Sequence, residues 1–399
     1  MQLTEKQKSE GWRIVKFGDV AQEVKASTKD PLSEGIERYI GLEHIDPESL
    51  RLARYGLIAD DNPTSTKKFT AGDILFGRRR AYLKKAAVAD FDGICSGDIT
   101  VIAPKGDDLV PDLLPFIVQS EPFFDWAVKH SAGGLSPRTK FKSLAEFEFP
   151  LPPRPRQEEI LSAIKKIYDL SNQTYDTYLY SLGFFQRIID KFVNNDRHEN
   201  PQDGRKRVMI KTLADANLSS LKGKTDPNYE FNYIDISSVE YPGNLTSPEK
   251  MIFKDAPSRA KRIVKENDVL VSTVRPNHRA TLFIDATKST DHIASTGFCV
   301  LTPKPNVNGE WLFYSTISKS FTHSMKNLMV GTSFPAVSDD DILVQKIDYP
   351  ENPETLEQYL VPIRSAYETT QQLITKYNKL KVLQKQTFQT YLQSNEEAA

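Results

Sequence analysis

Clusters of basic side chains are the residues of this chain whose types could do chemistry, and the chemistry they suit is contact with nucleic acid. The first cluster directly follows a strand-like segment and comprises Arg78, Arg79, Arg80, Lys84 and Lys85. Arginine can form paired hydrogen bonds with guanine, and lysine contacts backbone phosphates. The run could equally be a solvated face, so taken alone it leaves both interpretations open.

A comparable polar and basic segment follows a second strand-like run later in the chain. It comprises Thr273, Arg275, Asn277, His278 and Arg279. Asparagine suits adenine, and loops at strand ends hold such side chains on a rigid scaffold. The recurrence of a polar and basic loop at the matching place favours a DNA-contacting role over a solvated surface.

A glycine-rich loop, SAGGLSP (131–137), ends the first strand-rich stretch, and a GTSFP loop (331–335) ends the second. Basic residues follow the first of these loops, namely Arg138, Lys140 and Lys142. Because lysine and arginine neutralise phosphates, a local basic face is enough for DNA binding. We therefore count these three residues among the candidate DNA contacts.

The catalytic motifs that this sequence approaches are incomplete. LSSLKGKT (218–225) lacks the first glycine of a phosphate-binding loop, and Asn228 interrupts the adenine-methyltransferase tetrapeptide at DPNY (226–229). The six histidines form no HExxH pair, and the two cysteines, Cys95 and Cys299, lie far apart. The residues therefore support neither metal catalysis nor a disulfide framework.

Length and composition indicate a globular protein of two to three domains. The chain has 399 residues, of which 39% are hydrophobic, 10% aromatic and 26% charged, as is typical of folded domains. No apolar run approaches the roughly 18–20 residues that span a bilayer, and the cysteine usage fits a reducing cytoplasm. The formal net charge of −1 neither suggests nor excludes DNA binding, because the distribution of charge decides it.

The strand-rich stretches that position these loops repeat in the same order. The first runs from about residue 12 to 153, and the second from about 208 to 353. Two pairs of segments carry the match, namely GDILFGRRR (72–80) with NDVLVSTVR (267–275), and ITVIAPK (99–105) with FCVLTPK (298–304). Beta-branched and aromatic residues bounded by Gly, Pro and Asp predict strands in these segments.

Further elements are expected around these strands. Additional strand-like segments are RYIGL (38–42), FEFPLPP (147–153) and YIDIS (233–237). One helix is predicted over 111–130, with a break at Pro115 or Pro122 because proline disrupts a helix interior. Another helix is predicted over 309–329 in the second stretch.

Each strand-rich stretch opens into a long helical segment. From Gln157 neither proline nor glycine occurs until Gly183, and the pattern continues to about Val193, a rod of roughly 55 Å. Its apolar residues fit the seven-residue seam of a coiled coil, and they are Ile160, Ile164, Ile167, Tyr178, Phe185, Ile188 and Phe192. A second helix is predicted from about Leu356 to Ser394, with Leu373, Tyr377, Leu380, Leu383, Phe388 and Tyr391 as its apolar side. The alternative is an amphipathic helix lying on a globular core.

The junction between strand-rich stretch and helix resembles that of a known family. FPLPPRPRQEEI (149–160) is similar to the junction between target-recognition domain and conserved helix in type I restriction–modification specificity subunits. Pro152 and Pro153 match the family pattern, whereas Arg154 replaces the usual leucine and the expected Glu-Gln pair reads Gln-Glu. In the second copy the matching residues are Leu356, Glu357 and Gln358.

The resemblance implies a mixed α+β chain with two globular target-recognition domains separated by two long antiparallel coiled-coil helices, in a pseudo-two-fold internal repeat. The implied target-recognition domains are 1–153 and 208–353, the spacer helices 154–195 and 354–394, the linker 196–207 and the tail 395–399. Each domain would read one half of a split, asymmetric site in double-stranded DNA.

The resemblance also implies partners. The helix pair would bind two methyltransferase subunits, restriction subunits would complete the complex, and S-adenosylmethionine, ATP and Mg2+ would bind to these partners. The chain itself would be a non-catalytic subunit in the cytoplasm of a bacterium or archaeon, without membrane contact. Three alternatives stay open at this point: a DNA methyltransferase or nuclease with an unrecognised site, a protein-binding coiled-coil adaptor, and the specificity subunit of a related phage-defence system.

Overall fold

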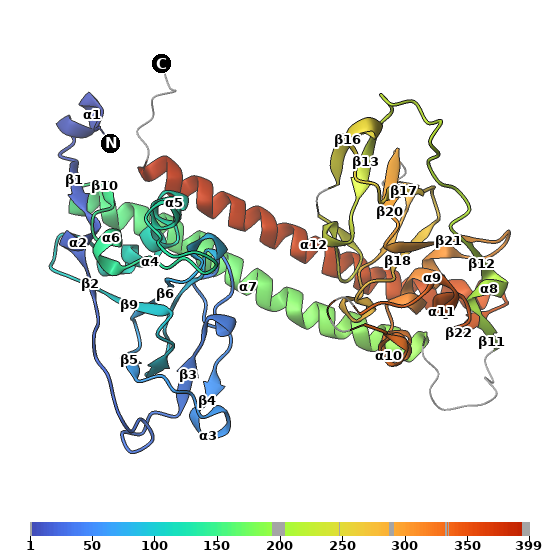
Figure 1. The fold of residues 1–399 in the computed structure, drawn as a ribbon, viewed down its shortest axis with the longest axis horizontal. Helices are drawn as coiled ribbons and strands as arrows, with labels where there is room; N and C mark the ends of the chain where they lie inside the picture. The colour runs from blue at the N-terminus through green and yellow to red at the C-terminus, as the bar shows by residue number, and fades with distance from the viewer. Residues whose placement is uncertain are drawn as a thin grey trace. The chain divides into compact units, whose positions relative to one another are not determined.

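The computed structural model describes residues 2–193, 204–246, 248–286, 291–331, 333 and 335–392, with the side chains of 391 and 392 left aside. The chain forms two compact units: unit 1 is Met1–Gln173 with Tyr377–Ala399, and unit 2 is Thr174–Lys376 (Figure 1). Each unit combines strands with helices, so the expected α+β class is confirmed. Over the described part of the chain, no helix is long and apolar enough to cross a membrane.

Two four-stranded sheets and a two-stranded ribbon form the strand framework of unit 1. The strands are β1 (Arg13–Lys16), β2 (Ala21–Glu23), β3 (Arg38–Ile40), β4 (Gly56–Leu57), β5 (Lys67–Phe69), β6 (Ile74–Gly77), β7 (Ala86–Val88), β8 (Gly93–Cys95), β9 (Ile99–Pro104) and β10 (Glu148–Leu151). One sheet has the order β2–β9–β6–β7 and the other β4–β3–β8–β5, while β1 pairs with β10. The pair β3–β8 is parallel, whereas β6 pairs antiparallel with both of its neighbours.

The helices of unit 1 are short apart from the long one that leaves it. They are α1 (Glu5–Ser9), α2 (Phe17–Val20), η1 (Leu42–His44), α3 (Ile58–Asp61), η2 (Ala81–Leu83), η3 (Pro111–Leu113), α4 (Leu114–Val118), α5 (Glu121–Lys129) and α6 (Phe141–Leu144). The helix predicted over 111–130 is therefore three elements. The break comes at Ser120, whose hydroxyl accepts a hydrogen bond from the Phe123 N–H and so caps α5 just before Pro122.

The core of unit 1 explains why β6 reads as a continuous apolar run. Ile74 and Phe76 pack into one cluster together with Phe123 and Phe124, whereas Leu75 packs into a second cluster on the opposite face. A strand buried on both faces carries apolar residues at every position instead of alternating ones. The end of β6 is consequently fixed from both sides, and the candidate loop that starts at Arg78 begins there.

Unit 2 repeats this framework. Its strands are β11 (Arg205–Met209), β12 (Ala214–Ala216), β13 (Glu230–Ile234), β14 (Val239–Glu240), β15 (Asn244–Leu245), β16 (Glu249–Ile252), β17 (Ala260–Ile263), β18 (Val269–Ser272), β19 (Thr281–Phe283), β20 (His292–Ser295), β21 (Phe298–Pro303) and β22 (Lys346–Pro350). The strand order matches that of unit 1. The two sheets are β12–β21–β18–β19 and β16–β13–β20–β17, and the ribbon is β11–β22. As in unit 1, the central strand is buried on both faces, with Val269 in one cluster and Leu270 in another.

The helical elements of unit 2 also follow the same order. They are α8 (Ile210–Leu213), η4 (Ile236–Ser238), η5 (Phe253–Asp255), η6 (Pro276–His278), α9 (Gly309–Thr316), α10 (Lys319–Leu328) and α11 (Asp339–Leu343). The helix predicted over 309–329 is present as two helices, because α9 ends at Thr316 and Ser318 caps α10, where its hydroxyl accepts from the Phe321 N–H.

Two long helices, α7 (Arg154–Phe192) and α12 (Pro353–Leu392), confirm the predicted long helical segments. Each contributes one part to unit 1 and the other to unit 2. Within unit 2 they run antiparallel, because the Phe185 and Phe192 rings meet those of Tyr367 and Tyr359 at 5.5 Å and 5.6 Å respectively. Pro362 lies inside α12, which continues through it.

The apolar seams predicted for the two long helices are confirmed in part. Ile160, Ile164 and Phe185 are buried, but Ile189 takes the fully buried place that was assigned to Ile188. On α12, Phe388 is buried whereas Leu383 is 46% exposed. The shift at 188 and 189 follows from the 3.6-residue turn of a straight helix, which drifts away from a strict seven-residue repeat.

The expected boundaries compare with the structure as follows. Arg205 already lies in β11, three residues before the expected start of the second strand-rich stretch, because it pairs with Pro350 of β22. Of the expected linker, residues 196–203 lie outside the described residues. The expected tail, 395–399, and the apolar side chain of Tyr391 lie outside them as well.

Candidate nucleic-acid interface

The first candidate loop follows β6 and turns through left-handed backbone at two places. Its 3-10 turn, η2, lies between Arg80 (φ 54°) and Lys84 (φ 50°). The Lys84 N–H donates to the Ala81 carbonyl at 2.9 Å and closes the turn. Residues other than glycine adopt this backbone conformation at a cost and keep it where the surroundings fix it, often at functional sites. The loop therefore has a defined shape.

The second candidate loop follows β18 and has the same geometry. Its 3-10 turn, η6, lies between Arg275 (φ 48°) and Arg279 (φ 55°). Arg275 therefore takes the place of Arg80, and Arg279 that of Lys84. The predicted correspondence between the two loops is confirmed at the level of the backbone.

In unit 1 the glycine-rich loop lies beside the candidate loop. Arg79 and Arg138 face each other in an isolated β-bridge, and the Arg80 N–H donates to the Pro137 carbonyl at 2.8 Å. The Thr139 N–H donates to the Arg78 carbonyl at 2.9 Å. Arginines that are far apart in the sequence thus belong to one surface.

Unit 2 joins its two loops in the same manner. Val274 and Ala336 form the equivalent bridge, and the Arg275 N–H donates to the Pro335 carbonyl at 2.8 Å. The SAGGLSP and GTSFP loops each contain a glycine with positive φ, Gly133 (+117°) in the first and Gly331 (+104°) in the second, where a side chain would be strained.

An aspartate organises the arginines of unit 1. Arg138 donates from Nε to Asp98 Oδ1 at 2.6 Å, and Arg79 donates from Nη1 to Asp98 Oδ2 at 3.3 Å. Burial acts to raise the pKa of Asp98, but the hydrogen bonds and positive charges of Arg138 and Arg79 outweigh it and hold that pKa below its usual value. Asp98 is therefore ionised at neutral pH and orients two guanidinium groups.

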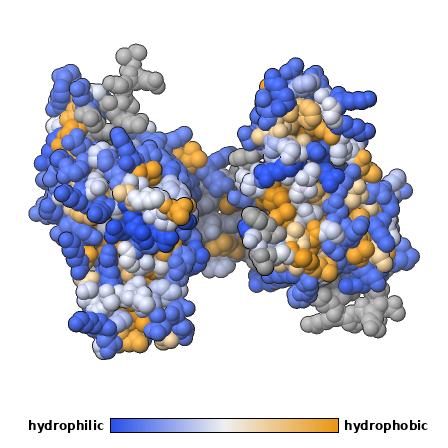
Figure 2. Space-filling view, viewed as in Figure 1, coloured by the Kyte–Doolittle hydropathy of each residue, from blue (hydrophilic) through white to orange (hydrophobic). Residues whose placement is uncertain are grey.

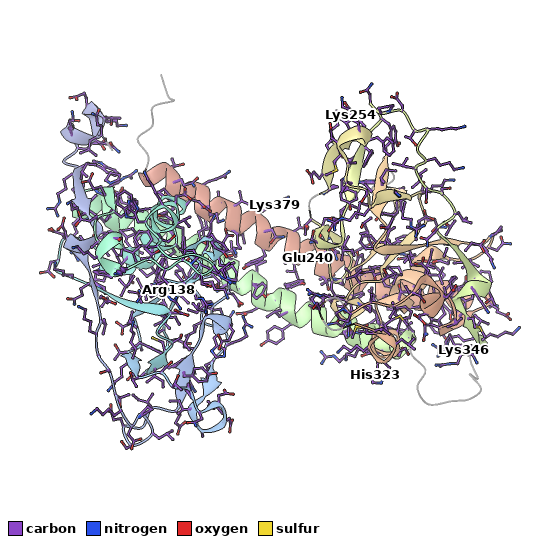
Figure 3. The ribbon with its side chains drawn as sticks, viewed as in Figure 1. Arg138, Glu240, Lys254, His323, Lys346 and Lys379 are labelled. Carbon is purple, nitrogen blue, oxygen red and sulfur yellow. The ribbon has the colours of Figure 1, made fainter. Side chains whose placement is uncertain are left out.

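Ser136 of the glycine-rich loop adds a second acceptor to this arrangement. Its hydroxyl oxygen accepts from Arg79 Nη2 at 3.1 Å and from Arg80 Nη2 at 3.4 Å. Arg138 nevertheless keeps 47% of its side chain exposed, at the surface of unit 1 (Figure 3). The structure thus brings Arg79, Arg80 and Arg138 together.

The remaining basic candidates of unit 1 divide into two groups. Lys140 and Lys142 are exposed beside the glycine-rich loop, at the start of α6. Lys85 instead donates from Nζ to the Leu42 carbonyl at 2.7 Å, and Lys84 forms ion pairs with Glu121 and Glu48. Lys84 and Lys85 are thus engaged within unit 1. Arg78 is half-buried, and its backbone N–H donates to the Asp98 carbonyl at 2.9 Å.

The candidates of unit 2 are more varied. Thr273 donates from Oγ1 to the Gly297 carbonyl at 2.9 Å, and Arg275 donates from Nη2 to the Ser333 carbonyl at 3.0 Å. Asn277 is half-buried and His278 is exposed, both in η6. Arg279 donates from Nη1 to Gln186 Oε1 on α7 at 2.7 Å.

Three residues of unit 1 that the sequence did not single out belong to this surface. Asp98 and Ser136 hold the arginines, and Leu135 at the tip of the glycine-rich loop is 98% exposed. The glycines that precede Leu135 marked the loop in the sequence, but nothing local connects Asp98 with Arg138.

The described residues offer no group of three or more His, Cys, Asp or Glu side chains that could hold a metal ion. Both cysteines are buried, and burial raises the pKa of the Cys95 thiol to about 12. A thiol with so high a pKa is a poor nucleophile at neutral pH. On the face of each unit seen in Figure 2, hydrophilic residues predominate and apolar residues gather in smaller patches.

The geometry defines a class of protein, namely a repeated scaffold that presents two polar, partly basic loop surfaces. A family model described as the type I restriction modification DNA specificity domain matches residues 9–177 and again residues 210–388. The chain therefore belongs to this family of type I specificity proteins.

Individual relatives are consistent with the family. The chain is 30% identical over 158 residues to the type I restriction enzyme EcoDI specificity subunit of Escherichia coli, covering 39% of this chain and 35% of that protein. It is 31% identical over 129 residues to the HindI specificity subunit of Haemophilus influenzae, covering 32% and 28% respectively. The matches thus span about a third of the length of these curated relatives.

A solved structure shows the same fold. The crystal structure of the type I restriction-modification system S subunit from M. genitalium matches with a TM-score of 0.56 at 11% identity, over 99% of this chain and 98% of that one.

Proposed function

We propose that this chain is the DNA-specificity subunit of a type I restriction–modification complex, in which each unit reads one half of a split, asymmetric site. The observation that carries the proposal is one loop geometry that occurs twice with different side chains. At the bridge between the two loops, unit 1 has Arg79 and Arg138 where unit 2 has Val274 and Ala336. A scaffold that keeps its backbone and changes its side chains suits the reading of two different sequences.

The chemistry of each surface suggests how the two half-sites differ. In unit 1, Arg138 is held through Nε, which leaves its two terminal nitrogens as a fork of the kind that pairs with guanine. Leu135 offers an apolar contact of the kind that recognises a thymine methyl group. In unit 2, Asn277 and Arg275 lie in the corresponding loop, where an amide suits adenine and a guanidinium suits guanine. Exposed Lys140 and Lys142 are proposed to contact phosphates.

The domain organisation and the partners form part of the same proposal. The target-recognition domains are 1–153 and 208–353, and α7 and α12 supply the spacer helices, to which two methyltransferase subunits bind. Restriction subunits complete the complex, and S-adenosylmethionine, ATP and Mg2+ bind to these partners. The chain itself is then a non-catalytic subunit. Membership of the specificity family does not favour a free-standing methyltransferase or nuclease.

Footprinting of the assembled complex on DNA tests the proposal. The expected result is two protected and sequence-specific segments separated by base pairs whose identity does not matter. A single continuous recognition sequence would contradict it. Incubation of the lone chain with DNA, S-adenosylmethionine and Mg2+ is the companion experiment, because turnover there would show an enzyme instead of a specificity subunit.

A further inference from the structure

The last left-handed residue of each candidate loop is linked to a long helix, through two carboxylates in unit 1 and directly in unit 2. In unit 1 this residue is Lys84. Its Nζ forms an ion pair with Glu121 of α5 and lies 3.7 Å from Glu48 Oε1. Lys385 of α12 lies 2.9 Å from the same Glu48 oxygen and 3.3 Å from Glu121 Oε1. Two carboxylates thus connect a loop lysine to a helix lysine, and we call Lys84, Glu121, Glu48 and Lys385 the unit 1 clamp.

The unit 1 clamp is only partly open to solvent. Its four side chains are between 30% and 39% exposed. Lys84 donates a hydrogen bond to Glu121, and this bond raises the pKa of Lys84 and holds the pKa of Glu121 below its usual value. Lys84 and Glu121 are therefore charged at neutral pH. Because the four side chains are partly buried, salt screens their interactions less than those of exposed pairs.

In unit 2 the corresponding residue is Arg279. It donates from Nη1 to Gln186 Oε1 of α7 at 2.7 Å, and the hydroxyl of Tyr241 donates to the same oxygen at 2.5 Å. The Arg279 guanidinium carbon also lies 5.0 Å from the centre of the Tyr241 ring, a distance typical of a cation–π contact. We call Arg279, Gln186 and Tyr241 the unit 2 clamp.

The two clamps occupy equivalent places in the repeat. Lys84 and Arg279 each follow the 3-10 turn of their loop in left-handed backbone. Gln186 and Lys385 lie the same number of residues after the first residues of α7 and α12, Arg154 and Pro353. The same loop position is therefore linked to the same helix position twice, through Glu48 and Glu121 in unit 1 and directly in unit 2, where the partners of the cation are a neutral amide and a phenol. The link between loop and long helix is thus kept although its side chains differ, which indicates a role for the link itself.

We infer that Lys84 and Arg279 are positioning residues, which fix each DNA-reading loop to a long helix and thereby set where its base-contacting side chains lie. The inference rests on the proposed function for the role of the loops. It assigns to Lys84 and Arg279 a function different from direct phosphate contact, which their charge alone would suggest.

A phosphate contact and a positioning contact respond differently when the cationic side chain is replaced by an uncharged one. A lost phosphate contact weakens binding about equally on all sequences and lowers the slope of log affinity against log salt by about 0.9. A lost positioning contact leaves that slope unchanged and reduces the preference for the correct base, because the guanidinium and amide groups are no longer aligned. It also acts on one half-site alone, so the other half-site serves as an internal control.

The experiment uses the complete complex with its partner subunits, on the DNA site defined by footprinting and on duplexes with one base pair changed in either half. Lys84→Met is expected to reduce discrimination about tenfold at one half-site, with the other half and the salt slope unchanged. Arg279→Met is expected to give the reciprocal pattern. Lys84→Arg keeps the charge and should restore discrimination, and Lys29→Met removes an exposed charge of unit 1 and should change nothing.

Uniform weakening by Lys84→Met with a reduced salt slope would overturn the inference in favour of phosphate contact. Amide hydrogen exchange over residues 78–85 tests the clamp without DNA. Faster exchange in Lys84→Met and wild-type exchange in Lys84→Arg are expected, and unchanged exchange in Lys84→Met would overturn the clamp whatever the DNA result. A wild-type complex without split specificity would instead refute the proposed function, so the two failures are distinguishable.

Discussion

Replacement of Asp98 by asparagine is the most informative change in unit 1. Asp98 accepts from Arg138 Nε at 2.6 Å and from Arg79 Nη1 at 3.3 Å, and its own side chain is only 19% exposed. Asparagine keeps the shape but removes the negative charge and turns one oxygen into a donor that would face a guanidinium. Both arginines should therefore lose their fixed orientation.

The free energy lost in Asp98→Asn should differ between folding and DNA recognition. Because Arg79 is 38% exposed, its ion pair with Asp98 contributes only about 0.2–1 kcal/mol to the stability of unit 1, and Arg138 is more exposed still. A misaligned bidentate base contact costs about 1–3 kcal/mol, roughly 5- to 150-fold in affinity for the correct base. The loss in discrimination between DNA sequences should therefore exceed the loss in folding stability.

Fluorescence anisotropy of the assembled complex measures this effect, with duplexes that carry the intact site or one base change in either half. Asp98→Asn should reduce discrimination at the half-site of unit 1 and leave the other half unchanged. Asp60→Asn, an exposed aspartate of unit 1, is the matched control and should behave as wild type. Unchanged discrimination in Asp98→Asn at both half-sites would refute the reasoning that Asp98 aligns base-reading arginines.

Three further predictions concern unit 2, the core and pH. Asn277→Ala should lower discrimination by about 1–3 kcal/mol at the half-site of unit 2 alone, as measured by the same anisotropy assay. Phe76→Ala, at a site with 0% exposure between β6 and α5, should cost about 3–5 kcal/mol of stability in chemical denaturation; a loss below 1 kcal/mol would contradict the packing. Asp98 and Glu121 have lowered pKa values in the folded chain, so their stabilisation is present above the unfolded values of about 3.9 and 4.3. It should be lost as pH falls through the lower folded values, and the acid-induced fall in Tm should be smaller in Asp98→Asn.

Much of the strand framework could be predicted from sequence because apolar runs mark strands buried on both faces. The segments 99–104 and 268–274 were predicted and correspond to β9 and β18. Short strands such as β11 were missed, since its residues Arg205 and Lys206 are stabilised by pairing with β22 and not by local preference. Two helices were divided by Ser120 and Ser318, whose capping role depends on the backbone beyond them.

The candidate site was predictable as a pair of loops but not as a set of contacts. The matching segments 72–80 and 267–275 indicated the equivalent loops, and the structure confirms their common backbone. Asp98 could not be inferred, because it reaches Arg138 only after the sheet brings β9 beside β6. Lys84 and Arg279 have the charge expected of DNA contacts, yet both are engaged within the protein. Local sequence carries charge, whereas the partner of a charge depends on tertiary structure.

Mapping of methylated bases in cells that carry the complex tests the central claim most directly. Wild-type cells should show one methylated motif in two parts with an unspecified gap. Cells in which Asp98 is replaced by asparagine should show relaxed sequence in one part only, and cells with Asn277→Ala in the other part only. A continuous motif, or a change in both parts from either substitution, would contradict the account of two units that each read one half of the site.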